Sequence, residues 1–345
     1  MTEAAWTSAR VCILPRLHGV GGPASFRARL TDGLTVRGVT LVDDPRDTAL
    51  DAILMIGGTS RITDLLAAKR NGVRIVQRLN GMNWIHRKRF TGVRHYLKSE
   101  WNNRLLTLIR GRIADHIVYQ SQFARTWWQT VHGSTRAGHE VIYNGVDLNA
   151  FSPEGPGERP VDLIRLLLVE AHLGGGNEPG LENALALAAQ LAWRVTQPVE
   201  LMVVGEVPSG LRASMHMPTG VRVNWAGVVP RDQIPRVDRS AHLLFSADLN
   251  AACPNSVVEA LACGLPVVSF ATGALPELLA DGAGQVAPYG SNYWKLEPPV
   301  VEPLAEAALE VLRHPEDYRA AARKRAEENF GLDRMTEKYL KALVG

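Results

Sequence analysis

Short apolar runs alternate with longer amphipathic segments along the whole chain. In the first half, the runs are Val11–Leu14, Ala52–Ile56, Arg74–Gln77, His116–Tyr119 and a last one that starts at Val141 and leads into the turn Asn144–Asp147. In the second half, they are Ile164–Val169, Glu200–Val204, Arg222–Trp225, His242–Ser246 and Val267–Phe270. Strands that alternate with helices in this way are typical of parallel sheets in α/β proteins.

A loop rich in proline, glycine and glutamate, Ser152–Pro160, separates the two series of runs. With 345 residues, the chain exceeds the usual size of one domain. We therefore expect an α/β protein with domains over residues 1–150 and 160–331. The end, Pro315–Leu343, is expected to be helical except near Asn329–Gly331. Ligands bind at the carboxyl ends of parallel strands, and in two-domain proteins they bind between the domains.

The composition predicts large hydrophobic cores and offers few metal ligands. Hydrophobic residues make up 46% of the sequence, yet no apolar run reaches the roughly 18 residues of a membrane-spanning helix. The N-terminal residues MTEAAWTSAR contain no apolar stretch like that of a secretory signal. Cys12, Cys253 and Cys263 are too few and too scattered for a disulfide framework or a zinc site. We expect a cytoplasmic protein.

Charge is distributed unevenly between the two halves. Residues 1–150 carry 21 Lys and Arg against 11 Asp and Glu, whereas residues 151–345 carry 17 against 24. The cations concentrate in Trp84–Arg112, where eight of them accompany a single acid, Glu100. A segment of this kind is often the solvated face of a helix. It also suits an anionic acceptor or an acidic membrane surface, because aromatic residues lie among the cations.

The segment Asn255–Phe270 predicts a helix followed by a buried strand. Asn255 and Ser256 precede an apolar run that a glycine and a proline end at Gly264–Pro266. The N–H groups of such a helix start suit an anion such as a phosphate. Glu259, one turn further along, suits neutral hydroxyl groups such as those of a ribose. An ordinary αβ unit with an exposed glutamate explains the spacing equally well.

Two glycine-rich loops, Gly19–Gly22 and Gly174–Gly176, each follow an expected strand and precede an expected helix. The backbone N–H groups of such loops can hold a phosphate. Neither loop has the three spaced glycines of the dinucleotide-binding fingerprint. Taken alone, each loop is better explained as a tight structural turn.

Two stretches of the sequence, taken together, resemble a known family. Val118–Pro153 contains VYQSQFARTWW and VIYNGVDLNAFSP, and Asn255–Leu278 reads NSVVEALACGLPVVSFATGALPEL. Both are similar to family 4 of the retaining glycosyltransferases, which have the GT-B fold. The resemblance implies two Rossmann-like domains facing a central cleft, with the acceptor bound by residues 1–150 and a nucleotide-sugar donor by residues 160–331. It also implies that the last helix, 332–345, returns to the first domain and that neither a metal ion nor a cofactor is needed.

Carried over position by position, the resemblance gives several residues a role in donor binding. Glu259 matches the glutamate that holds the ribose hydroxyls, and the backbone of Ser256 and Val257 matches the group that meets the phosphates. The other matching positions are Gly21 and Gly22 near the transferred sugar or the diphosphate, Val229 beside the nucleobase, and Gly273 and Ala274 in a turn near the donor.

The sequence departs from the family at two donor-binding positions. The family has a second glutamate, separated from the first by seven residues, that contacts the donor sugar, and here that position is Ala251. The family also has an Arg and a Lys after the first strand of the second domain, but no Lys or Arg occurs here between Arg165 and Arg194. The remaining candidates for meeting the diphosphate are the catalytic residues His172, Arg16 and Arg78 and the donor-binding backbone of Gly174 and Gly175.

We therefore predict a retaining hexosyltransferase of polysaccharide biosynthesis that uses a nucleotide diphosphate sugar and a glycan or glycolipid acceptor. Trp84, Arg87 and Lys88 are the candidate acceptor residues, and their segment predicts a cytoplasmic protein with a peripheral contact at the inner membrane face. With Ala251 in the sugar site, we expect weak selectivity between donor sugars, unless Asp248 and Asn250 take over the role. A catalytically silent nucleotide-sugar-binding protein and a nucleotide-sugar epimerase of the same fold are the alternatives.

Overall fold

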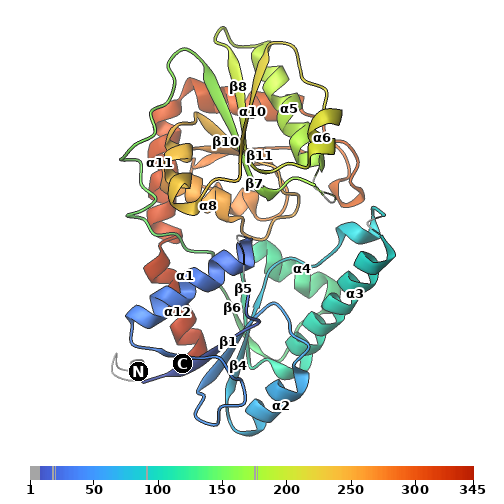
Figure 1. Cartoon of the computed structure of the whole chain (residues 1–345), viewed down its shortest axis with the longest axis vertical. Coiled ribbons are helices and arrows are strands. Elements are labelled where there is room, and N and C mark those ends of the chain that lie inside the picture. The colour runs from blue at the N-terminus through green and yellow to red at the C-terminus, as the bar shows by residue number, and fades with distance from the viewer. Residues whose placement is uncertain (1–7, 18, 20, 91, 175, 177) are drawn as a thin grey trace. The chain divides into compact units, whose positions relative to one another are not determined.

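The computed structural model describes residues 8–345 apart from positions 18, 20, 91, 175 and 177. The chain folds into two compact units, whose elements are labelled in Figure 1. Unit 1 consists of Met1–Gly145 and Gly331–Gly345, and unit 2 consists of Val146–Phe330. The division lies a few residues before position 150, because the N–H group of Val146 already donates to the carbonyl oxygen of Phe330 at 2.8 Å.

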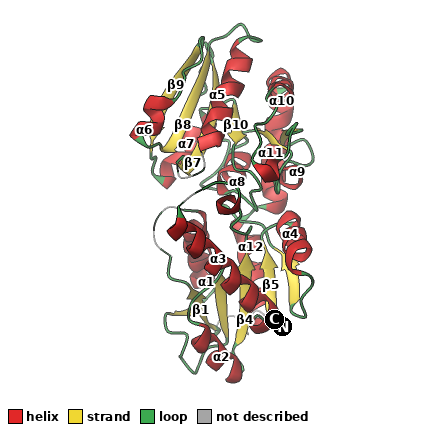
Figure 2. Ribbon diagram, turned by 90° about the vertical axis from the view of Figure 1, so that its right-hand side faces the viewer, coloured by secondary structure: helices red, strands yellow, loops and turns green. Residues whose placement is uncertain are grey.

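Unit 1 is built on a six-stranded parallel sheet with the strand order β2-β1-β3-β4-β5-β6. The strands are β1 (Arg10–Leu14), β2 (Thr40–Val42), β3 (Ala52–Ile56), β4 (Arg74–Leu79), β5 (His116–Tyr119) and β6 (Gly138–Val141). The helices α1 (Gly22–Val36), α2 (Ile62–Arg70), α3 (Val93–Leu108) and α4 (Gln122–His132) lie on its two sides (Figure 2). The α4 helix begins where the sequence offers a cap, because the Ser121 hydroxyl accepts the Ala124 N–H at 3.1 Å.

The last helix, α12 (Leu332–Val344), packs on unit 1 although it follows unit 2 in the sequence. Its residues Tyr339 and Leu340 belong to the same buried cluster as Phe26 and Leu30 of α1. The rings of Phe26 and Tyr339 have centroids 5.1 Å apart. The C-terminal helix is therefore part of unit 1.

Unit 2 is built on a second six-stranded parallel sheet, with the order β12-β11-β10-β7-β8-β9. Its strands are β7 (Ile164–His172), β8 (Val199–Glu206), β9 (Val221–Gly227), β10 (Leu243–Ser246), β11 (Val267–Phe270) and β12 (Gly284–Ala287). Its helices are α5 (Glu178–Ala192), α6 (Ser209–Ser214), α7 (Ile234–Arg239), α8 (Asn255–Ala262), α9 (Leu275–Leu278), α10 (Glu302–Arg313) and α11 (Pro315–Asn329).

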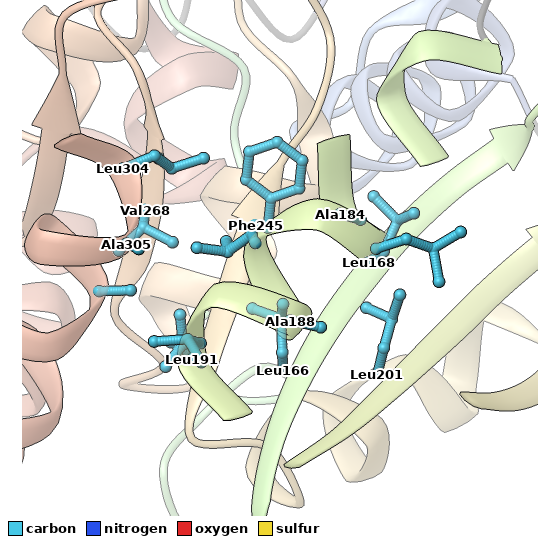
Figure 3. Packing of buried hydrophobic residues seen from close by; sticks show 14 of the residues in the cluster. Leu166, Leu168, Ala184, Ala188, Leu191, Leu201, Phe245, Val268, Leu304 and Ala305 are labelled. Atoms are coloured by element: carbon cyan, nitrogen blue, oxygen red, sulfur yellow. The ribbon is translucent and has the colours of Figure 1, made fainter. Parts of the chain in front are cut away.

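The main core of unit 2 lies between one face of the sheet and the helices α5 and α10. Figure 3 shows Leu168 of β7 and Phe245 of β10 packed among the side chains of Ala184, Leu191 and Leu304. These side chains come from the alternating apolar positions of the strands and the repeating apolar positions of the helices. The other face of β10 and β11 carries Ser246 and Ser269. The helix α8 packs against these two strands.

The edge strands β2 and β12 are absent from the sequence-based expectation. Each is short, and β2 is partly or fully exposed at every position, so neither produces an apolar run that stands out. The strand β7 extends to His172, beyond the expected end at Val169, through an irregularity in its pairing with β8. Within the described part of the chain, no helix is long and apolar enough to cross a membrane.

Candidate functional site

The carboxyl ends of the neighbouring strands β7 and β10 mark the candidate site. The sheet of unit 2 runs outward from this pair in two directions, through β8 and β9 on one side and through β11 and β12 on the other. In open parallel sheets, such a point of reversal leaves a crevice in which ligands bind. The chain segments that follow His172 and Ser246 both start at this end of the sheet.

The helix α8 begins after the loop that follows β10. Its N-cap residue is Pro254, which has no side chain able to cap the first turn. The first N–H groups of a helix have no acceptor inside the helix and lie at the positive end of its dipole. The backbone of Ser256 and Val257 lies in this first turn and has the character of an anion-binding helix start.

Glu259 lies one turn into α8, and only 8% of its surface is exposed. The neighbouring helix α7 contributes Asp238, which is 1% exposed. Burial, followed by the charge of Glu259, raises the pKa of Asp238 well above its usual range. The carboxylate of Glu259, largely withdrawn from water, can accept hydrogen bonds from two adjacent hydroxyl groups.

The turn after β11 packs tightly against the loop after β10. Gly273 has a φ of 60°, and a Cβ atom on it would lie 2.6 Å from both the nitrogen and the carbonyl oxygen of Ala251. Ala274 is fully buried and donates its N–H group to the same carbonyl oxygen at 2.8 Å. Ala251 is itself buried, so the position that carries a glutamate in the family offers only backbone and a methyl group.

Two carboxyl groups with raised pKa values lie near the carboxyl ends of β7 and β10: Glu170 within β7 and Asp248 after β10. Burial and, to a smaller extent, the charge of Asp248 raise the pKa of Glu170 to about 8. Burial raises the pKa of Asp248 to about 6. Gly205 of β8 has a φ of 133° and no side chain, which lets the carbonyl oxygen of Glu170 approach it closely at the irregularity of β7. The sequence analysis missed Glu170, although an acid directly after an apolar strand is a recognisable signal.

The loop after β7 presents acids where the family has cations. His172 places its Nδ1 atom 3.3 Å from a carboxylate oxygen of Glu206 and is half exposed. The N–H group of Gly176 donates to both carboxylate oxygens of Glu178, at 3.0 and 3.1 Å. Gly174 is buried against Pro208 and His172, and the candidate Gly175 lies outside the described residues. The Gly176 N–H group is therefore committed to a carboxylate instead of a phosphate.

The candidate cations of unit 1 have partners of their own. Arg16 follows β1 and forms an exposed ion pair of 3.1 Å with Asp43. Arg78 of β4 is 3% exposed, stacks 3.7 Å from the ring centroid of Phe26 and donates to Asn144 Oδ1 at 2.8 Å. In this position Arg78 supports the interior of unit 1, and contact with a diphosphate would require it to leave Phe26.

The remaining candidates fall into three places. Gly21 is the N-cap of α1 and Gly22 its first residue, and open space surrounds the position of a Cβ atom on Gly21. Val229 follows β9 and is partly exposed at the carboxyl end of the unit 2 sheet. The acceptor candidates lie before α3: Lys88 is exposed, Trp84 is partly buried, and Arg87 donates to Glu100 Oε2 at 2.9 Å.

The structure therefore brings Ser256, Val257, Glu259, Gly273 and Ala274 together at one end of unit 2. This group combines a helix start, one buried carboxylate and a glycine turn without a side chain. Such a set can hold an anion beside neutral hydroxyl groups.

Comparisons with known proteins identify the family of the chain. A family model described as "Glycosyl transferases group 1" matches residues 169–314, and a model described as "Glycosyltransferase Family 4" matches residues 55–150. Among curated proteins, D-inositol 3-phosphate glycosyltransferase of Mycolicibacterium smegmatis is 27% identical over 185 residues. This match covers 49% of the chain and 40% of that relative, so the chain spans less than half of its length.

Two solved structures share the fold over nearly the whole chain. HepE of Anabaena in complex with UDP-glucose has a TM-score of 0.69 at 16% identity, with 97% of this chain and 99% of that chain covered. WaaG, a glycosyltransferase involved in lipopolysaccharide biosynthesis, has a TM-score of 0.66 at 18% identity and coverages of 97% and 100%. The two parallel sheets of this chain form the GT-B fold, and the chain belongs to the group 1 glycosyltransferases of family 4.

Proposed function

We propose that this glycosyltransferase transfers a hexose from a nucleotide diphosphate sugar to a glycan or lipid-linked acceptor, with retention at the anomeric carbon. The observation that carries the proposal is the pairing of the α8 helix start with the buried Glu259 one turn further along. A phosphate needs the first feature, and the two hydroxyl groups of a ribose need the second. The UDP-glucose bound to HepE supports a donor of this class.

The helix start and Glu259 would divide the work of donor binding. The N–H groups at Ser256 and Val257 hold the diphosphate and stabilise the charge that develops on it as the glycosidic bond breaks. Glu259 holds the ribose, and Gly273, which lacks a side chain, lets the turn after β11 pack closely against Ala251 in the loop before α8. The chain's own part in the chemistry is then to position the donor and to stabilise the leaving group.

The carboxyl groups of Glu170 and Asp248 set a condition on this mechanism. A diphosphate beside ionised carboxylates is repelled, whereas the protonated forms can donate a hydrogen bond to it. The pKa of Glu170, about 8, favours its protonated form near neutral pH, whereas Asp248, with a pKa of about 6, is largely ionised there. The loop after β7 is thereby compatible with a diphosphate although it has no Lys or Arg.

The acceptor side is proposed to lie on α3, and its surface fits a layer of anionic lipid. Val93, Leu97 and Trp101 are 66%, 63% and 57% exposed, and their spacing of four residues places them on one face of the helix. We call this set the α3 stripe. The exposed cations Arg94, Lys98 and Arg104 belong to the same helix. Aromatic and aliphatic side chains flanked by cations are typical of helices that lie at a membrane surface.

A catalytically silent nucleotide-sugar-binding protein is the second candidate. The observation in its favour is the acidic loop after β7, where Gly176 donates to Glu178 and no cation follows the strand. An epimerase would also need an acid and a base next to the sugar. The pair of Glu170 and Asp248 supplies two titratable carboxyl groups that could take these roles.

The decisive experiment separates binding from turnover. A thermal-shift panel of nucleoside diphosphates and their hexose conjugates first identifies the nucleotide. The selected donor is then incubated with glycan and lipid-linked acceptors, and the products are analysed by NMR for their anomeric configuration. Transfer with an unchanged configuration supports the proposal, binding without turnover supports the silent protein, and interconversion of two free nucleotide sugars supports the epimerase.

A further inference from the structure

Asn250, in the loop after β10, combines an uncommon backbone conformation with an unpaired amide. Its φ is 59°, which places it in the left-handed region that asparagine tolerates better than most residues. Only 4% of the residue is exposed. Neither Nδ2 nor Oδ1 of its amide has a hydrogen-bond partner among the residues that the structure describes. Buried amides in folded proteins are nearly always paired, so this one indicates a missing partner.

Two hydroxyl groups close to this loop share the property. Thr272 Oγ1 and Ser246 Oγ are buried, and no described residue forms a hydrogen bond with either. Ser246 ends β10 and pairs with Ser269 of β11, and Thr272 follows β11 by two residues. The carbonyl carbon of Asn250 lies 2.8 Å from the position of a Cβ atom on Gly273, the neighbour of Thr272. The unpaired side chains of Asn250 and Thr272 thus belong to two loops that touch each other, and Ser246 ends the strand from which the first loop starts.

The chemistry of this set matches the hydroxyl groups of a sugar. An amide can donate and accept at the same time, and so can a hydroxyl group. A neutral amide also adds no further negative charge to a region that already contains Glu170 and Asp248. Its neighbour Ala251 occupies the position of the missing glutamate and cannot form a side-chain hydrogen bond. We propose that Asn250, supported by Thr272, binds a hydroxyl group of the donor hexose in place of that glutamate.

The inference rests on the proposed donor, and it requires a small movement. Since the amide atoms have no exposed surface, the side chain of Asn250 must turn toward the sugar when the donor binds. The unpaired state favours this movement, because the amide breaks no hydrogen bond within the protein when it binds the ligand. Sugar recognition would then be stronger than the alanine at position 251 alone predicts.

The test uses the full chain and the variants Asn250→Gly and Asn250→Asp. Glycine removes the amide and keeps the left-handed backbone without strain, and aspartate keeps the shape but loses the Nδ2 donor. Asn224→Ala, a partly exposed position in β9 of the same unit, is the matched control. Calorimetry measures the Kd for UDP and UDP-glucose, and for GDP and GDP-mannose. A second series replaces each glucose hydroxyl by hydrogen.

We expect Asn250→Gly to bind the sugar conjugate at least tenfold more weakly than wild type and to bind the nucleoside diphosphate within a factor of two. One deoxy analogue should bind wild type more weakly than the parent nucleotide sugar does. The same analogue should bind Asn250→Gly as tightly as the parent nucleotide sugar does. Equal affinity of wild type and variant for the conjugate would overturn the assignment while leaving nucleotide binding intact. Wild type that binds a nucleotide equally with and without its sugar would also overturn it, and wild type that binds no nucleotide would reject the proposed function as well. Parallel losses for nucleotide and conjugate would show a structural role instead.

Discussion

The N–H group of Ala274 donates a 2.8 Å hydrogen bond to the carbonyl oxygen of Ala251, and this bond joins the turn after β11 to the loop after β10. The neighbouring Gly273 has a φ of 60° and no room for a Cβ atom against Ala251. The bond therefore depends on glycine at position 273. It fixes the loop that precedes α8 and so positions the helix start that we propose for donor binding.

Gly273→Ala should weaken both the fold of unit 2 and the binding of nucleotide. The added Cβ atom would meet backbone at 2.6 Å, in a region of φ that alanine disfavours. We expect a loss of about 2–4 kcal/mol of unfolding free energy by chemical denaturation, since overpacking adds to the backbone strain. Gly72→Ala is the control, because Gly72 has a φ of 82° but open space around its Cβ position. Equal losses in the two variants would contradict the close packing at Gly273.

The pH dependence of the unfolding free energy should reveal the titration of the Glu170 carboxyl group. Its pKa in the folded chain is about 8, above the ordinary value of 4.5, so the folded state holds a proton that the unfolded chain releases at lower pH. Stability that depends on this group is therefore present below pH 4.5 and lost as the pH rises to about 8. Glu170→Gln, which stays neutral, should be more stable than wild type by roughly 1–4 kcal/mol at pH 8.5, since one pKa unit corresponds to about 1.4 kcal/mol.

Donor binding should follow the same titration. Wild type should bind a nucleotide sugar more tightly at pH 6 than at pH 8.5, because ionised Glu170 repels the diphosphate. The affinity of Glu170→Gln for the nucleotide sugar should depend less on pH than the affinity of wild type does. Calorimetry at the two pH values measures both, and an affinity of wild type that rises with pH would show that the diphosphate does not lie near Glu170.

The α3 stripe should control attachment to anionic vesicles. Leu97→Ala combined with Trp101→Ala removes two exposed apolar side chains and leaves every cation in place. We expect wild type to sediment with phosphatidylglycerol vesicles at low salt and the double variant to bind about tenfold more weakly. Trp193→Ala removes a tryptophan that is 83% exposed in unit 2 and should have no effect. If wild type stays in the supernatant at low salt, the proposed contact with an anionic membrane is wrong.

Much of the unit 2 site could be predicted from sequence because its signals are local. The start of α8, its end just before Gly264 and the position of Glu259 all lie within one short stretch. The electrostatic interaction of Asp248 with Glu170 could not be predicted in this way, because it depends on the pairing of β7 with β10 across many residues of chain. The stacking of Arg78 on Phe26 likewise depends on residues far apart in the sequence, and it explains why an arginine of β4 is buried.

The unpaired amide of Asn250 also has no signature in the sequence. The residue type suits a loop, and only the three-dimensional structure shows that its backbone is left-handed and that its amide is enclosed. The missing glutamate at position 251, by contrast, is visible from the motif alone. Sequence therefore identifies what the site lacks, and the structure indicates what replaces it.

The most direct test of the account is the affinity of Glu259→Ala for the nucleoside diphosphate. If Glu259 holds both ribose hydroxyls, its loss removes charge-assisted hydrogen bonds worth roughly 1.5–3 kcal/mol, and the Kd should rise about ten- to a hundredfold. Glu182→Ala, at an exposed position of α5 in the same unit, should bind like wild type. Circular dichroism and thermal melting confirm that both variants are folded. A folded Glu259→Ala variant that binds the nucleotide as tightly as wild type would contradict the account.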